Sequence, residues 1–124
     1  AVRTERAPQA TGPYGQAVAA GGLLFLSGQI GLDPATGDLI PGGIEAETER
    51  VLRNIEAILA SEGLDTDAVV RTTIYLVNLA DFAEVNQIYA RYFRQPFPAR
   101  VTVAVASLPK HARIEIDAIA VGKS

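Results

Sequence analysis

The sequence predicts an α+β fold in which one mixed β-sheet carries two helices on a single face. Residues 100–105 alternate strictly, with valine at every second position, which is the side-chain period of a strand. Residues 51–59 instead place apolar side chains at helical intervals. The predicted element order is β-β-β-α-β-α-β-β. Strands mixed with two helices favour a single sheet covered on one side.

Length and composition place limits on the class of protein. The 124 residues fit one domain spanning 1–124, with 48% hydrophobic and 20% charged residues. The net charge of −3 and the lack of a Lys/Arg cluster argue against a nucleic-acid partner. No apolar run of about 18 residues exists, so no membrane span is expected. Residues 1–6 lack the apolar core of a signal peptide, which makes the cytoplasm the default location.

The N-terminal half is predicted to hold three short strands before the first helix. They cover residues 1–6, 17–20 and 23–27. Gly21 and Gly22 supply the positive φ angles of a tight hairpin between the last two. The helix that follows buries a stripe formed by Val51, Leu52, Ile55, Ile58 and Leu59. Gly63 is expected to end it.

The C-terminal half is predicted to hold three more strands and a second helix. The strands cover residues 69–77, 100–105 and 112–121. The second helix starts at Asp81, which forms an approximate capping box with Glu84. Its apolar stripe comprises Phe82, Val85, Tyr89 and Tyr92 or Phe93. In strand 100–105 the valines at 101, 103 and 105 are expected to face the core.

Arg100 begins a strand that is otherwise apolar. Since an unpaired buried charge is costly, this residue requires a partner or a pocket. The last two strands are joined through residues 108–109 and are therefore predicted to pair antiparallel. The expected cross-strand pairs are Thr102 with Glu115 and Arg100 with Asp117. An arginine fork there suits a substrate carboxylate, and a nearby glutamate suits a water molecule. Periodicity alone favours a plain cross-strand salt bridge.

Other candidate groups are weaker. His111 is the single histidine and is expected to be exposed and inert, so neither a histidine metal site nor a Ser-His-Asp triad using Ser27 is predicted. No cysteine is present to act as a nucleophile. Tyr14 reads more readily as a packing residue than as a ligand contact, and Asn86 is ambiguous. Because one helical layer covers only one face of the sheet, self-association is expected to cover the other.

Five blocks of residues together resemble the RidA (YjgF) family of reactive-intermediate deaminases. The blocks are Gly12-Pro13-Tyr14-Gly15-Gln16-Ala17, Leu26-Ser27-Gly28-Gln29-Ile30, Val85-Asn86, Phe97-Pro98-Ala99-Arg100, and Leu108-Pro109 followed by Ile114-Glu115-Ile116-Asp117-Ala118-Ile119-Ala120. The resemblance covers nearly the whole chain. The spacing of the Pro-Ala-Arg and Ile-Glu-Ile blocks makes it specific, whereas each short piece alone is weak.

The resemblance implies a chorismate-mutase-like fold and a homotrimer with a cleft between each pair of subunits. It also implies hydrolysis of enamines and imines such as 2-aminoacrylate and 2-aminocrotonate. Pyridoxal-phosphate-dependent dehydratases release these compounds, and the products are 2-keto acids and ammonia. No metal or cofactor is implied.

The same resemblance gives roles to individual residues. Arg100 matches the arginine that holds the substrate carboxylate, and Glu115 matches the glutamate that orients water. The remaining pocket positions are Tyr14, Ser27, Gly28, Asn86 and Thr102, with Tyr14 expected from a neighbouring subunit. Thr102 departs from the family, since many bacterial members have Cys there. Residues 94–96 form a shorter segment than in many relatives, and Gly15 replaces a larger residue.

Two other functions compete with deamination. Endoribonuclease or translation-inhibitor activity is reported for some relatives, although the acidic net charge argues against it. A non-catalytic protein that binds small carboxylates in the Arg100 cleft is the third hypothesis. Chorismate mutase activity is a fold-level analogy only.

Overall fold

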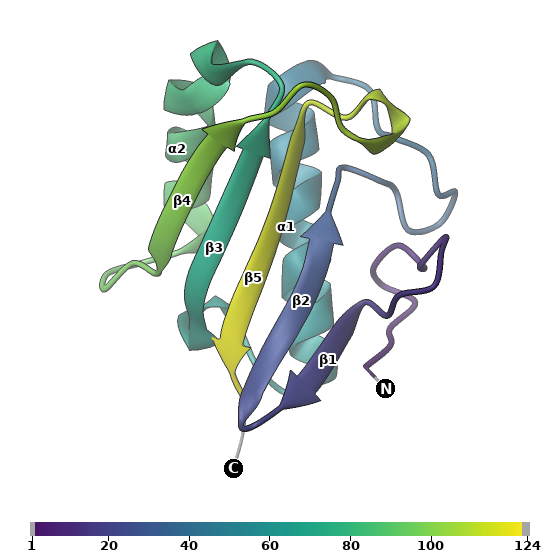
Figure 1. The fold of residues 1–124 in the computed structure, drawn as a ribbon, viewed down its shortest axis with the longest axis vertical. Helices are drawn as coiled ribbons and strands as arrows, with labels where there is room; N and C mark the ends of the chain where they lie inside the picture. Colours follow the sequence, from purple (N-terminus) through teal and green to yellow (C-terminus); the bar gives the residue numbers. More distant parts are fainter. Residues whose placement is uncertain (1, 123–124) are drawn as a thin grey trace.

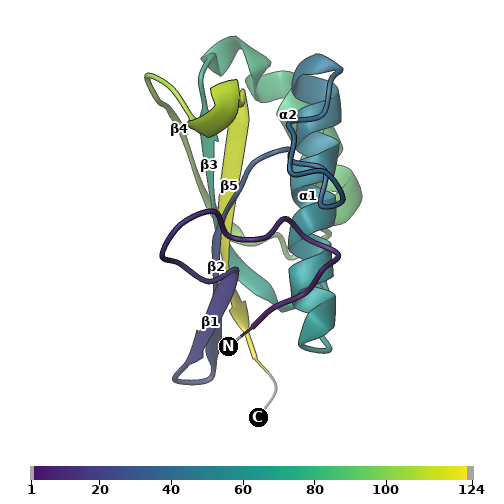
Figure 2. The ribbon, with the colours of Figure 1, turned by 90° about the vertical axis from the view of Figure 1, so that its right-hand side faces the viewer.

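The computed structural model describes residues 2–122, which form one β-sheet backed by helices (Figures 1 and 2). Within these residues five strands follow the order β1-β2-β5-β3-β4. The strands are β1 Ala17–Ala20, β2 Leu23–Gln29, β3 Val69–Leu76, β4 Ala99–Ala104 and β5 Ile114–Val121. The helices are α1 Gly43–Ser61 and α2 Phe82–Tyr92, and Figure 2 shows both on the same side of the sheet. The predicted mixed sheet with two helices on one face is therefore confirmed.

The predicted strand over residues 1–6 is wrong. Ala1 lies outside the described residues, and Val2 makes only an isolated bridge with Ala17. The buried side chain of Gln16 satisfies the backbone here instead of a neighbouring strand. Its amide donates to the carbonyl oxygens of Thr4 at 3.0 Å and Pro8 at 2.8 Å, and its Oε1 accepts from the Thr4 amide at 2.8 Å. The Gln16 side chain therefore ties two points of the loop before β1 together.

The hairpin between β1 and β2 forms as predicted. Gly21 and Gly22 have φ angles of 60° and 79°, which a tight hairpin turn requires. Further along, the pairing of β2 with β5 shifts between Leu26 and Gln29. Ser27 and Gly28 together face the single residue Asp117, so β2 carries a β-bulge at this point. Bulges of this kind bend a strand and redirect its side chains, and they are common beside functional sites.

The helices bury the predicted stripes with one exception. The five apolar residues at 51–59 are all buried, and Gly63 ends α1 with a φ of 71°. Val85 and Tyr89 of α2 are buried, but Phe82 is 41% exposed. The predicted capping box is also wrong, because Asp81 makes no side-chain cap. The Asn78 side chain instead caps the preceding turn by accepting from the Ala80 amide at 3.0 Å.

The position of β4 differs from the prediction. It pairs in parallel with β3, with Arg100 opposite Thr72 and Thr102 opposite Ile74. β3 separates it from β5, so the predicted pairs of Arg100 with Asp117 and Thr102 with Glu115 are wrong. The physical reason is that α2 provides a crossover connection, which suits parallel neighbours, whereas the 3-10 turn Pro109–His111 carries the chain past β3 to β5.

The two faces of β4 are reversed relative to the prediction. Val101 and Val103 are 37% and 39% exposed on the face away from the helices, whereas Arg100 and Thr102 point to the helical side and are half-buried. The alternation itself is correct, but alternation does not indicate which face is covered. Among residues 2–122, nothing forms a layer over the exposed face, which also carries Val18 and Phe25 at 59% and 41% exposure. We call this surface the open face.

Candidate active site

The predicted site residues lie in two clusters on opposite faces of the sheet. Arg100 of β4 points to the helical face, as its register partner Thr72 does. On β5 the residues Ile114 and Ile116 are buried under the helices, so Glu115 between them points to the open face. The prediction that Arg100 and Glu115 share one surface of the same chain is therefore wrong.

The first cluster holds the Arg100 guanidinium against α2. Its Nη2 donates to Asn86 Oδ1 at 2.5 Å. Its Cζ lies 5.0 Å from the ring centroid of Tyr89 and 5.4 Å from that of Phe82, within the range of cation–π attraction. Within residues 2–122 no carboxylate forms a salt bridge with it. The cross-strand salt bridge with Asp117 that periodicity favoured is absent among residues 2–122.

The Tyr89 ring beneath Arg100 is itself held by two neighbouring side chains. The Tyr89 hydroxyl and Thr72 Oγ1 lie 2.7 Å apart, and the Tyr89 ring stacks on Phe93 with centroids 4.3 Å apart. Burial raises the pKa of Tyr89, so the ring under the cation carries no charge of its own at neutral pH. A guanidinium fixed in this way, with donors to spare, is suited to an anionic ligand.

Thr102 lies on the same face as Arg100, two residues further along β4. Its Oγ1 is fully buried and has no hydrogen-bond partner among the described residues. Buried hydroxyls are normally bonded, because desolvation without a partner costs about 1–3 kcal/mol. The hydroxyl is therefore a second polar group beside Arg100 with unused bonding capacity.

The second cluster is built on the bulge in β2. The Glu115 side chain lies directly over Gly28, and a Cβ on that glycine would come within 2.8 Å of the Glu115 carboxyl carbon. A side chain at position 28 would therefore displace the Glu115 carboxylate. Burial, and secondarily the nearby Asp117 carboxylate, raise the pKa of Glu115 above that of an ordinary glutamate. A half-buried carboxyl with a raised pKa is better suited to hold and return a proton than an exposed glutamate is.

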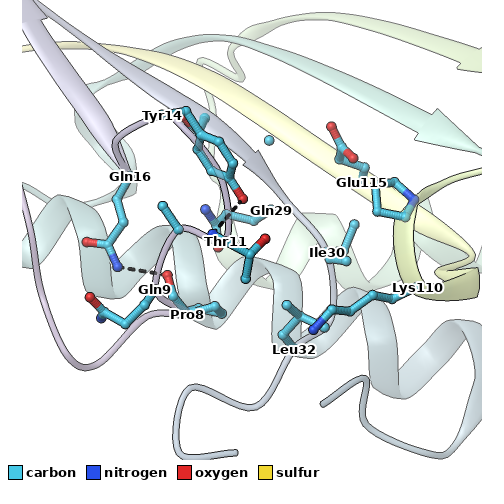
Figure 3. A pocket seen from close by; sticks show the side chains of 14 residues that line it. Pro8, Gln9, Thr11, Tyr14, Gln16, Gln29, Ile30, Leu32, Lys110 and Glu115 are labelled. Atoms are coloured by element: carbon cyan, nitrogen blue, oxygen red, sulfur yellow. Dashed lines mark hydrogen bonds between the residues drawn. The ribbon is translucent and has the colours of Figure 1, made fainter. Parts of the chain in front are cut away.

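A cavity of about 400 Å³ opens beside this carboxyl. Figure 3 shows Tyr14, Glu115 and Lys110 around it, contributed by the N-terminal loop, β5 and the turn before β5. Ser27 and Gly28 also line it. Ser27 Oγ donates to the Gly15 carbonyl oxygen at 2.6 Å, which ties β2 to the loop. Tyr14 is 54% exposed, so it projects at the mouth and does not pack in the core.

The structure thus brings together Tyr14, Ser27, Gly28 and Glu115 in one group, and Arg100, Asn86 and Thr102 in the other. It does not bring the two groups together within one chain. Sequence reasoning missed Lys110, which lines the cavity with a left-handed φ of 56° and donates from Nζ to the Gly37 carbonyl oxygen at 2.8 Å. No signal at that position distinguishes it from any surface lysine.

Three further findings concern metal binding, the single histidine and membrane insertion. The described residues hold no group of three or more His, Cys, Asp or Glu side chains arranged for a metal ion. His111 is exposed, as predicted. Across residues 2–122, neither helix combines the length and the apolar character that crossing a membrane requires.

Replacement of Gly28 by alanine tests the close approach to Glu115. The added methyl group must displace the carboxylate, so any activity that depends on Glu115 is expected to fall about 10- to 100-fold, with little change in melting temperature. Gly122→Ala is the matched control, because its Cβ would meet only an ordinary contact at 3.4 Å. Steady-state kinetics and thermal melting of both variants check this. Full activity in Gly28→Ala would contradict the placement of Glu115.

Comparison with known proteins identifies the family of the chain. Residues 4–122 match the model of a family described as endoribonuclease L-PSP. The chain belongs to this family, the RidA family. An Arabidopsis thaliana protein named Reactive Intermediate Deaminase A, chloroplastic, is 54% identical over 119 residues, covering 96% of this chain and 64% of that protein.

Two other proteins also match nearly the whole chain. A Bos taurus protein named 2-iminobutanoate/2-iminopropanoate deaminase is 48% identical over 120 residues, which cover 97% of this chain and 88% of that one. The crystal structure of Escherichia coli TdcF with bound serine is 39% identical, with a TM-score of 0.91 and 98% coverage of both chains. The arrangement of the sheet and helices is therefore also that of this solved structure.

Proposed function

We propose that this RidA-family protein hydrolyses reactive 2-imino and 2-enamino acids to 2-keto acids and ammonia. Compounds of the 2-aminoacrylate and 2-aminocrotonate type, released by pyridoxal-phosphate-dependent dehydratases, are the expected substrates. The names of the Arabidopsis and Bos taurus relatives support this reaction. The structural observation that carries the proposal is the Arg100 guanidinium, which is held by Asn86 and two aromatic rings without a carboxylate partner among residues 2–122.

Arg100 is the proposed clamp for the substrate carboxylate. Every substrate of this class carries a carboxylate next to the reacting carbon, and an arginine fork binds that group with two parallel hydrogen bonds. Asn86 occupies one nitrogen and so sets the direction of the remaining donors. Thr102 is proposed to line the pocket beside the substrate carboxylate. Its Oγ1 is buried, so the side chain must turn about χ1 for the hydroxyl to bond to the substrate.

The complete site is proposed to form between two copies of the chain. Arg100 and Glu115 face opposite sides of one sheet, and a substrate of a few carbon atoms does not reach both. A neighbouring copy that lays its edge strand β4 on the open face brings its own Arg100, Asn86 and Thr102 to the Glu115 cluster. A homotrimer in a chorismate-mutase-like arrangement closes three equivalent clefts in this way. The exposed valines of β4 are the apolar surface that such contact would bury.

Glu115 is the proposed acid and base of the reaction. It takes one proton from water as the oxygen bonds to the iminium carbon, which leaves a neutral aminol. It then returns that proton to the nitrogen. The C–N bond then breaks and the C=O bond forms. The proton of the aminol hydroxyl passes to the Glu115 carboxylate and from there to the released ammonia, giving ammonium. The iminium carbon is already electrophilic, so the proposal includes no metal or cofactor, and positioning supplies much of the rate.

A coupled assay tests the proposal. Purified protein is added to a threonine dehydratase in the presence of semicarbazide, which traps the imine before it hydrolyses. We expect faster formation of the keto acid and less semicarbazone, in proportion to the protein added. Unchanged partition between the two products would contradict the proposal.

Two parallel measurements address the competing functions. Stabilisation against heat by 2-ketobutyrate, without turnover of the imine, would indicate a binding protein that uses the same Arg100 cluster. Cleavage of single-stranded RNA without imine hydrolysis would indicate the endoribonuclease activity named in the family description. Intact RNA together with accelerated imine hydrolysis is the expected combination.

A further inference from the structure

Asp117 lies on the open face two residues after Glu115 and opposite the bulge of Ser27 and Gly28. The Tyr75 hydroxyl donates to Asp117 Oδ2 at 2.9 Å. The backbone partner of Tyr75 in the sheet is Glu115, whereas the partner of Asp117 is Thr73. The tyrosine therefore reaches diagonally from a position beside Glu115 to hold the next carboxylate along the strand, a distance that aromatic side chains span.

The charge on Asp117 is held by a hydroxyl and not by a cation. In the described part of the chain, no lysine or arginine forms a salt bridge with it. The pKa of Tyr75 is raised, first by this hydrogen bond and then by burial, so the phenol keeps its proton and continues to donate. Residues two apart on one face are separated by about 7 Å, at which distance a second carboxylate disfavours ionisation of Glu115.

The other charged or titratable groups around Glu115 are engaged elsewhere or lie further away. Lys110, on the turn before β5, donates to the Gly37 carbonyl oxygen. Arg113 immediately precedes β5, and its Nε lies 3.7 Å from Oε2 of the buried Glu47. Arg71 of β3 is in register with Ile119, beyond Asp117, and Tyr14 of the loop bonds through its hydroxyl to the Thr11 amide at 3.4 Å. Within one chain, Asp117 is thus the charged group that acts most directly on Glu115. In the proposed assembly the Arg100 guanidinium of a neighbouring copy favours ionisation of Glu115, and Asp117 opposes that effect.

We infer that Asp117, fixed by Tyr75, is a positioning residue that keeps Glu115 able to hold and return a proton. The inference rests on the proposed deamination for its use, but its electrostatic content concerns the protein alone. A glutamate that ionises too readily accepts the water proton poorly. A fixed negative charge on the same face corrects this without touching the substrate. Tyr75 prevents Asp117 from turning into solvent, where its effect on Glu115 would be screened.

The titration of Glu115 measures this coupling without any turnover. Its side-chain carboxyl is followed by carbon NMR against pH in the parent, Asp117→Asn, Tyr75→Phe and Glu62→Gln proteins. Glu62 is an exposed carboxylate near the β1–β2 turn and serves as a charge-matched control. We expect the pKa of Glu115 to fall in Asp117→Asn, to fall less in Tyr75→Phe and to stay unchanged in Glu62→Gln. The same titration curve in Asp117→Asn and the parent would overturn the inference.

The pH profile of imine hydrolysis tests whether catalysis depends on the coupling between Asp117 and Glu115. Removal of the neighbouring charge makes Glu115 easier to ionise, so the acid limb of kcat/KM moves to lower pH in Asp117→Asn. We expect the rate on the plateau to fall about three- to tenfold, since a weaker base transfers protons less efficiently. Asp117→Glu, which keeps the charge, is expected to restore the position of the limb. If the acid limb of kcat/KM lies at the same pH in Asp117→Asn as in the parent, the positioning role of Asp117 is overturned. A parent protein without activity would contradict the proposed function, while the NMR titration would still decide the coupling.

Discussion

Arg100→Ala is expected to lower kcat/KM for imine hydrolysis by about 100-fold or more, because charge-assisted hydrogen bonds to the substrate carboxylate are lost. The loss follows from the arrangement of the site. Within residues 2–122 the guanidinium has no carboxylate partner to release, so the variant removes a ligand contact and not a structural ion pair. Kinetics in the dehydratase-coupled assay measure the effect.

Two further variants separate charge from geometry at this position. Arg100→Lys keeps the charge but loses the fork, so we expect partial activity with a raised KM. Arg91→Ala removes an exposed arginine of α2 whose pairing with Glu49, at 3.8 Å, is weak, and it is expected to retain parent kinetics. Parent activity in Arg100→Ala would refute the carboxylate clamp.

Glu115→Gln is expected to lose about 100-fold or more in kcat, because glutamine neither accepts nor returns a proton. The same variant is expected to be slightly more stable than the parent at pH 7, by about 0.5 kcal/mol, the scale that remains for a half-exposed carboxyl after solvent screening. Burial raises the pKa of Glu115, so ionisation opposes folding. Activity and stability thus change in opposite directions.

The pH dependence of the stability shows whether ionisation of Glu115 opposes folding. With its pKa raised in the folded protein, Glu115 favours folding below its unfolded-state pKa of about 4.3, and this contribution is lost as the pH rises through the folded-state value. Glutamine does not titrate, so the advantage of Glu115→Gln is expected at pH 7 and absent at pH 3. Urea unfolding of the two proteins at both pH values measures this. An equal loss of stability at both values would show that Glu115 is structural.

Much of the fold could be predicted from the sequence because it depends on local patterns. The glycine pair of the first hairpin and the helical stripe at 51–59 are local, and both were correct. The strand that pairs with β4 is not determined by a local pattern. Its place beside β3 follows from how α2 crosses the sheet, and adjacency in the sequence pointed to β5 instead. The face reversal of Val101 and Val103 has a related cause, since a period of two is the same for either face.

The residues of the candidate site were likewise predicted only in part. Gly28 and Glu115 were named from a family resemblance, and the structure shows that the Glu115 carboxyl occupies the space that a Cβ on residue 28 would take. Tyr75 and Lys110 were missed. Tyr75 matters only because β3 lies beside β5, and Lys110 enters the cavity through a left-handed turn that no residue type in the segment signals. Both depend on tertiary contacts between distant segments of the chain.

The placement of Arg100 and Glu115 on opposite faces of the sheet has a genetic consequence. If each cleft takes its arginine from one copy and its glutamate from another, two alleles that are each inactive supply different intact halves. In a randomly mixed trimer of Arg100→Ala and Glu115→Gln chains, about a quarter of the clefts regain both groups. A cell that carries both defective alleles would then recover a phenotype that neither allele supports alone, and dominance relations among mutations in this gene would depend on the face each residue occupies.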